Sequence, residues 1–394
     1  MSLGAWFLLA AGGLVAYAYA GYPALLWVLS RLRRFAPQPV APSEWPAISI
    51  ALAAHNEERS IGATLECLLA TDYPPGRRQI VVVSDASTDR TDDIVRSFRD
   101  RGVELLRLPQ RSGKTAAENA ALGWLSGDIV LNTDASVRVH RDAVKLLVTA
   151  LQDPGVGTAS SRDISVARLD DPAGAGEAGY VGYEMWVRRL ETRVYGIVGA
   201  SGSLYATRST LHQQVVPAAL SRDFSAALIA REHGFRAVSV DEAICYVPRG
   251  RSLTREYRRK VRTMTRGLET MWHRRHLLNP IRYGVFSWML ISHKLLRWLV
   301  PWALVLGAGG VVMVSIDVAR ARWVVAAAGV VLGLGAGGWA LAEGRVLPRA
   351  LALPAFLLMG VVAGLEAWVR ALRGERNPIW EPTRREAPLG PSGT

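Results

Sequence analysis

Five acidic or amide side chains follow three apolar runs of the sequence, where each run ends. They are Asn56, Glu57, Asp85, Asp89 and Asp134. The runs have the length and β-branched content of buried strands and alternate with helical stretches, which predicts β-α units around a mostly parallel sheet. Ligands of such sheets bind at the carboxyl ends of the strands. An anionic edge of this kind suits a hydroxyl-rich ligand together with a hard cation.

A lysine stands at the start of a helical run. Gly113 and Lys114 directly precede the stretch Thr115–Leu125, which includes Asn119. A lysine at a helix start opposes the helix dipole unless an anion lies nearby. A diphosphate bound at the helix N-terminus would explain it. The alternative is an ordinary solvated lysine.

Four motifs occur in a fixed order along the chain. They are ISIALAAHNEE (48–58), IVVVSDASTDRT (80–91), GKTAAENAA (113–121) and GDIVLNTDAS (127–136). Their order, spacing and residue types resemble those of the family-2 glycosyltransferases, which have the GT-A fold. The resemblance covers roughly residues 46–275. It implies an α/β, Rossmann-like domain with a mostly parallel sheet, a nucleotide-sugar donor, and a glycan or lipid acceptor.

The resemblance assigns the donor side of the site. It places Asn56 and Glu57 against the nucleoside, Asp85 at the base or ribose, and Lys114 with Asn119 at the diphosphate. For Asn56 and Glu57 the alternative is a cap for a helix that begins near residue 58. Asp85 would serve alone, because Ser84 stands where the family usually has a second acidic residue.

Asp134 lies where the family has its Asp-x-Asp motif, which binds a divalent cation. In this chain the second aspartate is replaced by Ser136. A hydroxyl is a weaker oxygen ligand than a carboxylate. The resemblance therefore implies Mg²⁺ or Mn²⁺ as cofactor, with Asp134 as the stronger ligand and Ser136 as the weaker one.

The acceptor side is assigned to two further segments. The small residues Gly199, Ser201 and Gly202 resemble the acceptor loop of the family, although a flexible turn is the alternative. Asp223 follows at the start of a helix, where the family has its general base. A carboxylate is chemically suited to that task. The alternative is an acid placed in the first turn by the helix dipole.

The stretch Thr254–His276 predicts a basic amphipathic helix at a membrane surface. Apolar residues recur at helical spacing, and arginines occupy most of the other positions. Arg262 is the best match to the arginine of the Gln-x-x-Arg-Trp motif in polysaccharide synthases, which contacts the diphosphate. The alternative, favoured for Arg255, is that these arginines bind only lipid headgroups.

Apolar segments flank this polar block. Residues 3–30 carry no charge and are long enough to cross a bilayer. A signal peptide would need basic residues before the run, whereas Arg31, Arg33 and Arg34 follow it. Basic residues directly after a span favour a cytoplasmic location for the segment that follows. We therefore expect an integral protein of the inner or plasma membrane with a cytoplasmic catalytic domain.

The expected organisation has six parts. They are an N-terminal transmembrane helix in 1–34, a Pro-rich linker in 35–45, a GT-A domain in 46–253, an amphipathic interfacial helix in 254–280, a C-terminal transmembrane region in 281–372 and a tail in 373–394. The C-terminal region holds three candidate spans, Leu299–Ile316, Trp323–Leu341 and Leu351–Val369. Three crossings would place the tail outside, but its arginines favour the inside. Either residues 283–298 add a crossing or one candidate does not cross.

The net charge of +13 suits anionic lipid better than nucleic acid, because the arginines lie beside apolar spans and no nucleic-acid motif is present. Two isolated cysteines suit a reducing compartment. We expect a membrane-embedded inverting glycosyltransferase of cell-surface polysaccharide synthesis, with a layout that resembles cellulose, hyaluronan and chitin-oligosaccharide synthases. One alternative is a single-sugar transferase acting on polyprenyl phosphate or a glycolipid. Another is a non-catalytic membrane subunit that binds nucleotide sugars.

Overall fold

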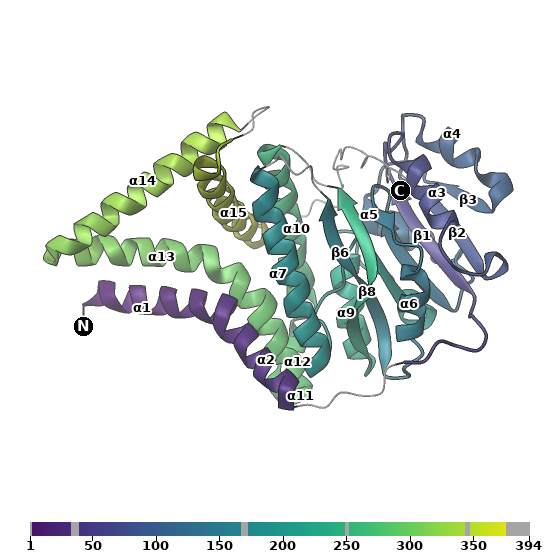
Figure 1. The fold of residues 1–394 in the computed structure, drawn as a ribbon, viewed down its shortest axis with the longest axis horizontal. Coiled ribbons are helices and arrows are strands. Elements are labelled where there is room, and N and C mark those ends of the chain that lie inside the picture. The colour runs from purple at the N-terminus through teal and green to yellow at the C-terminus, as the bar shows by residue number, and fades with distance from the viewer. Residues whose placement is uncertain (1, 33–38, 167–171, 249–251, 343–346, 376–394) are drawn as a thin grey trace, which may run out of the picture.

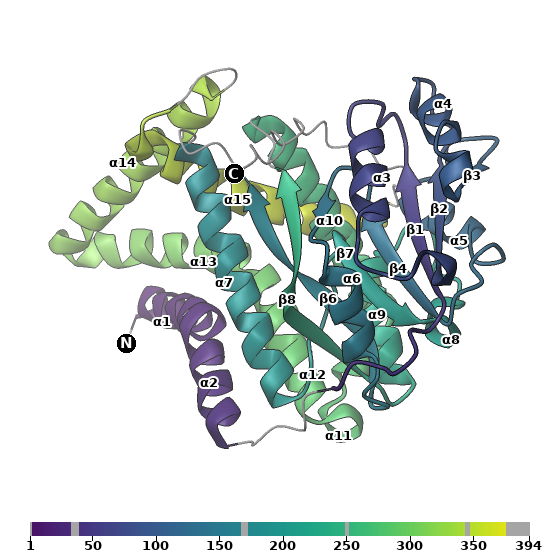
Figure 2. The ribbon, with the colours of Figure 1, turned by 45° about the vertical axis from the view of Figure 1, so that its right-hand side comes forward.

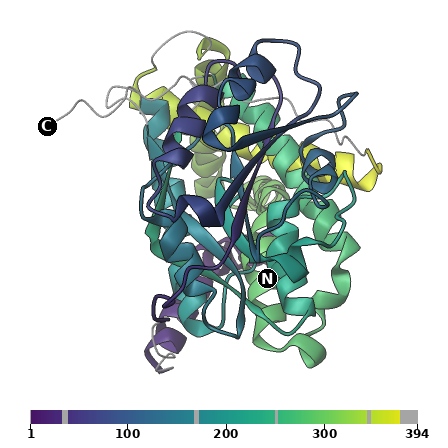
Figure 3. The same cartoon turned by 90° about the vertical axis from the view of Figure 1, so that its right-hand side faces the viewer.

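The computed structural model describes residues 2–32, 39–166, 172–248, 252–342 and 347–375. The α/β domain lies on one side of the molecule and the long apolar helices on the other (Figure 1). Viewed from the domain, its purple and blue first half lies in front and the apolar helices lie behind it (Figure 3). Most of the predicted tail, and residues 35–38 of the predicted linker, fall outside the described residues.

The domain is built on one mixed sheet of eight strands in the order β3-β2-β1-β4-β7-β6-β8-β5. The strands are β1 Ile48–Ala54, β2 Arg78–Ser84, β3 Val103–Arg107, β4 Ile129–Asp134, β5 Arg138–Val139, β6 Val156–Val166, β7 Leu204–Arg208 and β8 Arg236–Pro248. The first four strands in this order pair in parallel, as predicted. Strand β7 is antiparallel to both of its neighbours, so the second half of the sheet is mixed.

Helices cover both faces of the parallel half of the sheet, which is why its strands are apolar on both sides. Every residue of β1 is buried. Ile50 and Leu52 of β1 belong to a core that includes Leu65 of the helix α3. Ala53 belongs to a second core, which includes Ala117 of the helix α5. Alternate residues of one strand therefore face opposite helical layers.

The described residues form fifteen α-helices. They are α1 Leu3–Ala16, α2 Tyr22–Leu32, α3 Ile61–Leu69, α4 Thr91–Arg96, α5 Lys114–Ala120, α6 Ala143–Ala150, α7 Pro172–Val194, α8 Ser209–His212, α9 Arg222–Glu232, α10 Leu253–His273, α11 Pro280–Tyr283, α12 Val285–Leu290, α13 Leu296–Asp317, α14 Ala319–Leu341 and α15 Arg349–Leu372. In the described parts of the chain, four continuous helical segments are long and apolar enough to cross a membrane: Leu3–Leu32, Val285–Asp317, Ala319–Leu341 and Arg349–Leu372.

Two of these segments are bent at π-helical turns. The turn Tyr17–Gly21 joins α1 to α2, and the turn Ile291–Leu295 joins α12 to α13. A π-helical turn is a recognised cause of helix kinks. The two segments run side by side and bend together, so that α2 and α12 follow the domain while α1 and α13 point away from it (Figure 1). Residues 285–298 therefore belong to the same continuous segment as α13, and Tyr283 and Gly284 precede it.

A buried polar network fixes this bend to the domain. Glu191 of α7 accepts hydrogen bonds from the Tyr22 hydroxyl at 2.5 Å and from Nδ1 of His293 at 2.6 Å. The other ring nitrogen of His293 lies 2.8 Å from Glu184, which also binds Nη1 of Arg297 at 2.6 Å. Helix α7 thus lies between the sheet and the apolar helices and contacts both (Figure 2).

Helix α15 runs along α10. Leu253 at the start of α10 shares a core with Ala352, and the Thr265 hydroxyl lies 3.5 Å from the carbonyl oxygen of Ala367. Between these points Met264 contacts the position of Gly364. Both ends of α15 therefore lie beside α10. The predicted amphipathic helix is present as α10, although its α-helical part ends three residues earlier than predicted.

Candidate active site

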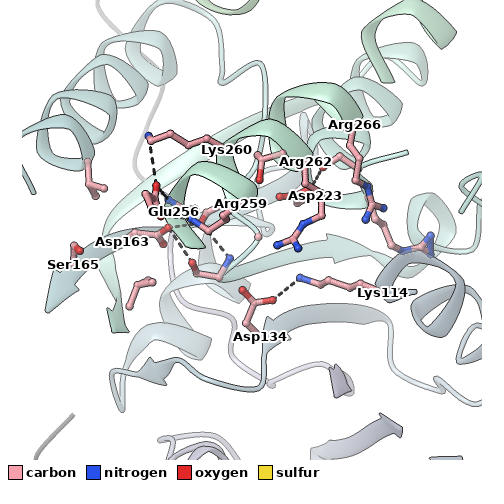
Figure 4. A pocket seen from close by; sticks show the side chains of 18 of the residues that line it. Lys114, Asp134, Asp163, Ser165, Asp223, Glu256, Arg259, Lys260, Arg262 and Arg266 are labelled. Carbon is pink, nitrogen blue, oxygen red and sulfur yellow. Dashed lines mark hydrogen bonds and ion pairs between the residues drawn. The ribbon is translucent and has the colours of Figure 1, made fainter. Parts of the chain in front are cut away.

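A cavity of about 370 Å³ lies between the carboxyl end of β4, the loop before β7, the start of α9, and the helices α7 and α10. Six of the predicted site residues line it: Lys114, Asp134, Ser201, Gly202, Asp223 and Arg262. They come from segments far apart in the sequence. The fold therefore gathers residues of both the predicted donor side and the predicted acceptor side in one place (Figure 4).

Lys114 and Asp134 form an ion pair in this cavity. Nζ of Lys114 lies 2.5 Å from Oδ1 of Asp134 and 4.0 Å from Oε1 of Glu118. Burial alone would lower the pKa of Lys114, but Asp134, Glu118 and Asp223 outweigh it and raise the pKa above its ordinary value. Lys114 is thus a fixed positive charge among three carboxylates at the end of β4.

Asp223 lies in the first turn of α9 and faces this ion pair (Figure 4). Its Oδ1 accepts hydrogen bonds from the Ser221 hydroxyl and, at 2.9 Å, from the backbone N–H of Phe224. Its Oδ2 lies against Gly202, where an added Cβ would approach it to 2.7 Å. One oxygen is therefore held by the helix start, while the other lies along the predicted acceptor loop.

Helix α10 contributes four cations to the cavity: Arg259, Lys260, Arg262 and Arg266. Arg266 donates from Nη2 to the Thr115 hydroxyl at 2.7 Å and to the carbonyl oxygen of Leu220, which ties α10 to α5 and to the segment before α9. Arg259 forms a bidentate pair with Glu256 of the same helix, with distances of 2.7 and 2.6 Å. Arginines at such a site suit a diphosphate group.

Asp85 lies behind the cavity and does not line it. It is 1% exposed. Its two carboxylate oxygens accept hydrogen bonds from the backbone N–H groups of Ser112, at 2.6 Å, and Gly113, at 2.8 Å. Asp85 thus shapes the loop that presents Lys114. This arrangement gives a structural reason for a carboxylate at the end of β2.

Asn56 and Glu57 also lie outside the lining of the cavity. Asn56 has a positive φ of 53° and accepts from the backbone N–H of Thr88 at 2.8 Å, which links the loops after β1 and β2. Glu57 accepts from the Ser60 hydroxyl at 2.5 Å, just before α3. The N-cap of α3 is Ser60, no side-chain hydrogen bond caps the helix, and the helix begins at Ile61, later than expected. The contact of Asn56 and Glu57 with a nucleoside stays a prediction.

Three other predicted residues lie beside the cavity and not on its wall. The Asn119 amide binds the backbone of Val216 and accepts from Arg222 at 2.9 Å, so it secures the segment before α9. Gly199 packs against Phe224. Ser136 is 8% exposed and follows Asp134 by two residues without lining the cavity.

Three carboxylates of the cavity wall were not predicted from the sequence: Glu118, Asp163 and Glu256. Glu118 is four residues after Lys114 on α5, and that spacing places both on one helix face, which is a signal the sequence does contain. Burial raises the pKa of Glu118 against the opposing charges of Lys114 and Arg222. Asp163 on β6 accepts from the hydroxyls of Ser201 at 2.5 Å and Ser203 at 3.1 Å. It holds the predicted acceptor loop, and no motif marks it.

The residues present fit a cation that is shared with a ligand. Among the described residues, no group of three or more His, Cys, Asp or Glu side chains converges on one metal position. Mg²⁺ in phosphate sites is commonly held by one or two carboxylates and by the phosphates themselves. Asp134 at the strand end fits that arrangement, whereas a metal caged by the protein alone does not.

Comparison with known proteins agrees with this fold. Residues 49–172 match the family model Glycosyl transferase family 2. Over 126 residues, 31% of this chain and 29% of the relative, the chain is 36% identical to an N-acetylglucosaminyltransferase of Rhizobium meliloti (strain 1021). Over 122 residues, 30% of this chain and 26% of the relative, it is 33% identical to the beta-monoglucosyldiacylglycerol synthase of Synechocystis sp.. The chain thus spans less than a third of these curated relatives.

A solved structure matches nearly the whole chain. It is a mannosyltransferase from Pyrobaculum calidifontis in complex with GDP-Man and Mn²⁺, with a TM-score of 0.68, 24% identity, and coverage of 94% of this chain and 99% of that chain. The mixed sheet and its helical layers are therefore those of a GT-A glycosyltransferase. The stretch that matches the family-2 glycosyltransferase model, residues 49–172, lies within that fold. The predicted fold class is confirmed.

Proposed function

We propose that this chain is a membrane-embedded inverting glycosyltransferase that moves a sugar from a nucleotide-sugar donor to an acceptor hydroxyl. One observation carries the proposal. A single cavity brings Asp134 at the end of β4 and Lys114 at the start of α5 together with Asp223 and the arginines of α10. The same grouping argues against a non-catalytic binding subunit, because such a subunit has no use for a carboxylate on the acceptor side.

In the proposed reaction, Asp223 accepts the proton of the acceptor hydroxyl. The acceptor oxygen then forms a bond to the anomeric carbon of the donor sugar, while the bond from that carbon to the phosphate oxygen breaks. The nucleoside diphosphate leaves with the bonding electron pair. Lys114 and Arg262 line the same cavity, and preorganised cations of this kind would stabilise the negative charge that develops on the diphosphate.

Asp134 would hold a Mg²⁺ or Mn²⁺ ion together with the donor diphosphate. When bound, such an ion neutralises the charge of the leaving diphosphate. The protein's own part is to place the Asp134 carboxylate at the end of β4. The Mn²⁺ in the mannosyltransferase structure supports this choice of metal.

We infer that the acceptor is borne by a lipid. Tyr180 of α7 and Lys260 of α10 line the cavity, and Nζ of Lys260 lies 5.6 Å from the Tyr180 ring and 5.1 Å from the Phe356 ring of α15. The cavity wall therefore contacts an apolar helix directly. The glycolipid named in the Synechocystis relative supports the same choice.

The secretion of a long polysaccharide has less support. A translocation path would need spans that surround it. Within α14, only Gly335 and Gly338 are buried. The remainder of that helix suits contact with lipid. We therefore favour the transfer of a single sugar to a glycolipid or polyprenyl phosphate as the proposed activity. Polymer formation would be detected from the length of the product.

We further propose that the domain is cytoplasmic and that α15 lies along the membrane surface. Arg31 at the end of α2 favours the cytoplasmic side for the domain. Helices α1, α13 and α14 would then cross the membrane. Helix α15 packs along α10, and the arginines of α10 line the polar cavity. Both ends of α15 would therefore stay on the side of the membrane where the domain lies. Arg370 and Arg373 would be cytoplasmic as well.

The test is the variant Asp223→Asn, assayed with a panel of nucleotide sugars and membrane lipid extract. Asparagine keeps the size of the side chain but cannot accept the proton, so transfer should fall by about a hundredfold to ten-thousandfold. Donor binding, measured by calorimetry, should persist. Asp93→Asn is the matched control, since Asp93 is an exposed first-turn acid of α4. Near-normal transfer by Asp223→Asn would show that the base lies elsewhere, and product length separates single transfer from polymerisation.

A further inference from the structure

We propose that Glu118 is the second carboxylate ligand of the divalent cation, in place of the aspartate that Ser136 replaces. The inference rests on the proposed function, since the cation is the one that accompanies the donor diphosphate. It changes the expected ligand set of the site from Asp134 and Ser136 to Asp134 and Glu118. The second ligand would thus come from helix α5 and not from the strand-end motif.

Glu118 is a buried carboxylate on the wall of the cavity. It is 2% exposed and belongs to the lining of the site. Among the described residues, its Oε2 atom has no hydrogen-bond partner. A buried charged oxygen without a partner is costly, so such groups are usually paired or coordinate a metal. This oxygen therefore indicates a ligand that the protein does not itself supply.

The Lys114 ammonium group marks the place where such a ligand would lie. Its Nζ is 2.5 Å from Oδ1 of Asp134 and 4.0 Å from Oε1 of Glu118. A positive charge thus already lies within 4.0 Å of both carboxylates. A bound divalent ion would hold its oxygen ligands at about 2.1 Å. Glu118 would therefore turn toward Asp134, and Lys114 would move to the phosphates of the donor.

The alternative ligand is poorly placed. Ser136 does not line the cavity, and the intervening Ala135 carbonyl oxygen accepts from the Thr64 hydroxyl at 2.7 Å, which anchors this turn to α3. The other explanation for the burial of the Glu118 carboxylate is an ion pair with Arg222. The Nη atoms of Arg222 donate to Asn119, at 2.9 Å, and to the carbonyl oxygen of His212, at 3.0 Å, and its Nε has no hydrogen-bond partner among the described residues, so no hydrogen bond joins Arg222 to Glu118.

The experiment measures Mn²⁺ binding to the purified full chain by the loss of the free-ion paramagnetic resonance signal, with and without GDP or UDP. We expect Glu118→Gln to weaken Mn²⁺ binding by about tenfold or more, because one anionic oxygen ligand is lost. Lys114→Met, which removes the competing ammonium group, should tighten the binding of Mn²⁺ alone severalfold. Glu256→Gln is the control, since Glu256 lines the same cavity but is paired with Arg259.

Several outcomes would overturn the proposal. It is wrong if Glu118→Gln binds Mn²⁺ as the unmodified chain does, or if the unmodified chain binds no Mn²⁺ under any of these conditions. It is also wrong if Lys114→Met leaves the affinity for Mn²⁺ alone unchanged. That result would mean that the Lys114 ammonium group does not compete with Mn²⁺ for Asp134 and Glu118. Circular dichroism of each variant separates loss of a ligand from loss of folding. Sugar transfer that persists in a variant with unchanged metal affinity would leave the proposed function intact.

Discussion

At the scale of the residue, the approach of Gly202 to Asp223 decides where the proposed base lies. A Cβ at position 202 would come within 2.7 Å of Oδ2 of Asp223, which is closer than any real contact of that kind. The carboxylate would have to move away from the acceptor loop. A side chain at position 202 would therefore displace the carboxylate of the proposed base.

We predict that Gly202→Ala lowers the turnover of sugar transfer by about a hundredfold, because displacement of a reacting group by about 1 Å can cost that much. Donor affinity should change little, since Lys114 and Asp134 are untouched. Steady-state kinetics with calorimetry would check both. Gly123→Ala is the control, as nothing lies within 4 Å of its added Cβ. Equal losses in the two variants would contradict the role given to Gly202.

The sequence predicted which residues belong to one site more accurately than it predicted the hydrogen-bond partners of each residue. Lys114, Asp134, Asp223 and Arg262 were placed in one site and do line one cavity. The contact of Asp85 with the base or ribose stays a prediction, and its oxygens accept hydrogen bonds from the loop before Lys114. A motif fixes a residue on its strand or helix. Whether the side chain faces the ligand or a neighbouring backbone depends on contacts from distant segments, which local sequence does not encode.

At the scale of the element, close packing of small residues holds α1 against α13. A Cβ on Gly4 would lie 2.8 Å from the carbonyl oxygen of Gly310, and a Cβ on Gly310 would lie 2.8 Å from that of Gly4. Close backbone approach through small residues is the usual basis of helix association in membranes. Each glycine thus allows the backbone of the other helix to approach closely.

We predict that Gly310→Leu destabilises the protein in detergent by about 1–3 kcal/mol, the usual cost of overpacking. Gly309→Leu is a matched control in the same helix, because nothing lies within 4 Å of its added Cβ. Both changes alter helix propensity equally, so the difference in melting temperature reports the contact between α1 and α13. Equal melting temperatures would mean that the two helices do not pack as described.

Periodicity identified the long helices but not their bends. The segment Val285–Asp317 is continuous, whereas the sequence suggested a span from Leu299 and left residues 283–298 open. The bend occurs at the π-helical turn Ile291–Leu295, where His293 reaches Glu184 and Glu191 of α7. These partners lie more than a hundred residues away in the chain. A bend fixed by such contacts has no local signature.

At the scale of the whole molecule, the path of α15 supports the proposal that one site takes a nucleotide-sugar donor and a lipid-borne acceptor. The polar wall of α10 faces the cavity, and its other side packs on α15. By hydrophobicity alone, α15 is a candidate membrane-crossing helix. The arginines at its end favour the cytoplasmic side, whereas a fourth crossing would place them outside. The two agree once α15 lies beside α10, because three crossings by α1, α13 and α14 leave both the domain and the end of α15 on one side.

We predict this topology from cysteines introduced singly at three exposed positions: Arg59 of the domain, Val318 between α13 and α14, and Glu375 after α15. In intact cells, an impermeant maleimide should label Val318→Cys and should reach Arg59→Cys and Glu375→Cys only after permeabilisation. The native Cys67 and Cys245 are half-buried and buried, so background labelling should be low, and the unmodified chain measures it. Labelling of Glu375→Cys from outside would show that α15 crosses the membrane. Labelling of Arg59→Cys from outside would invert the orientation, and a cytoplasmic supply of nucleotide sugar could then not reach the cavity.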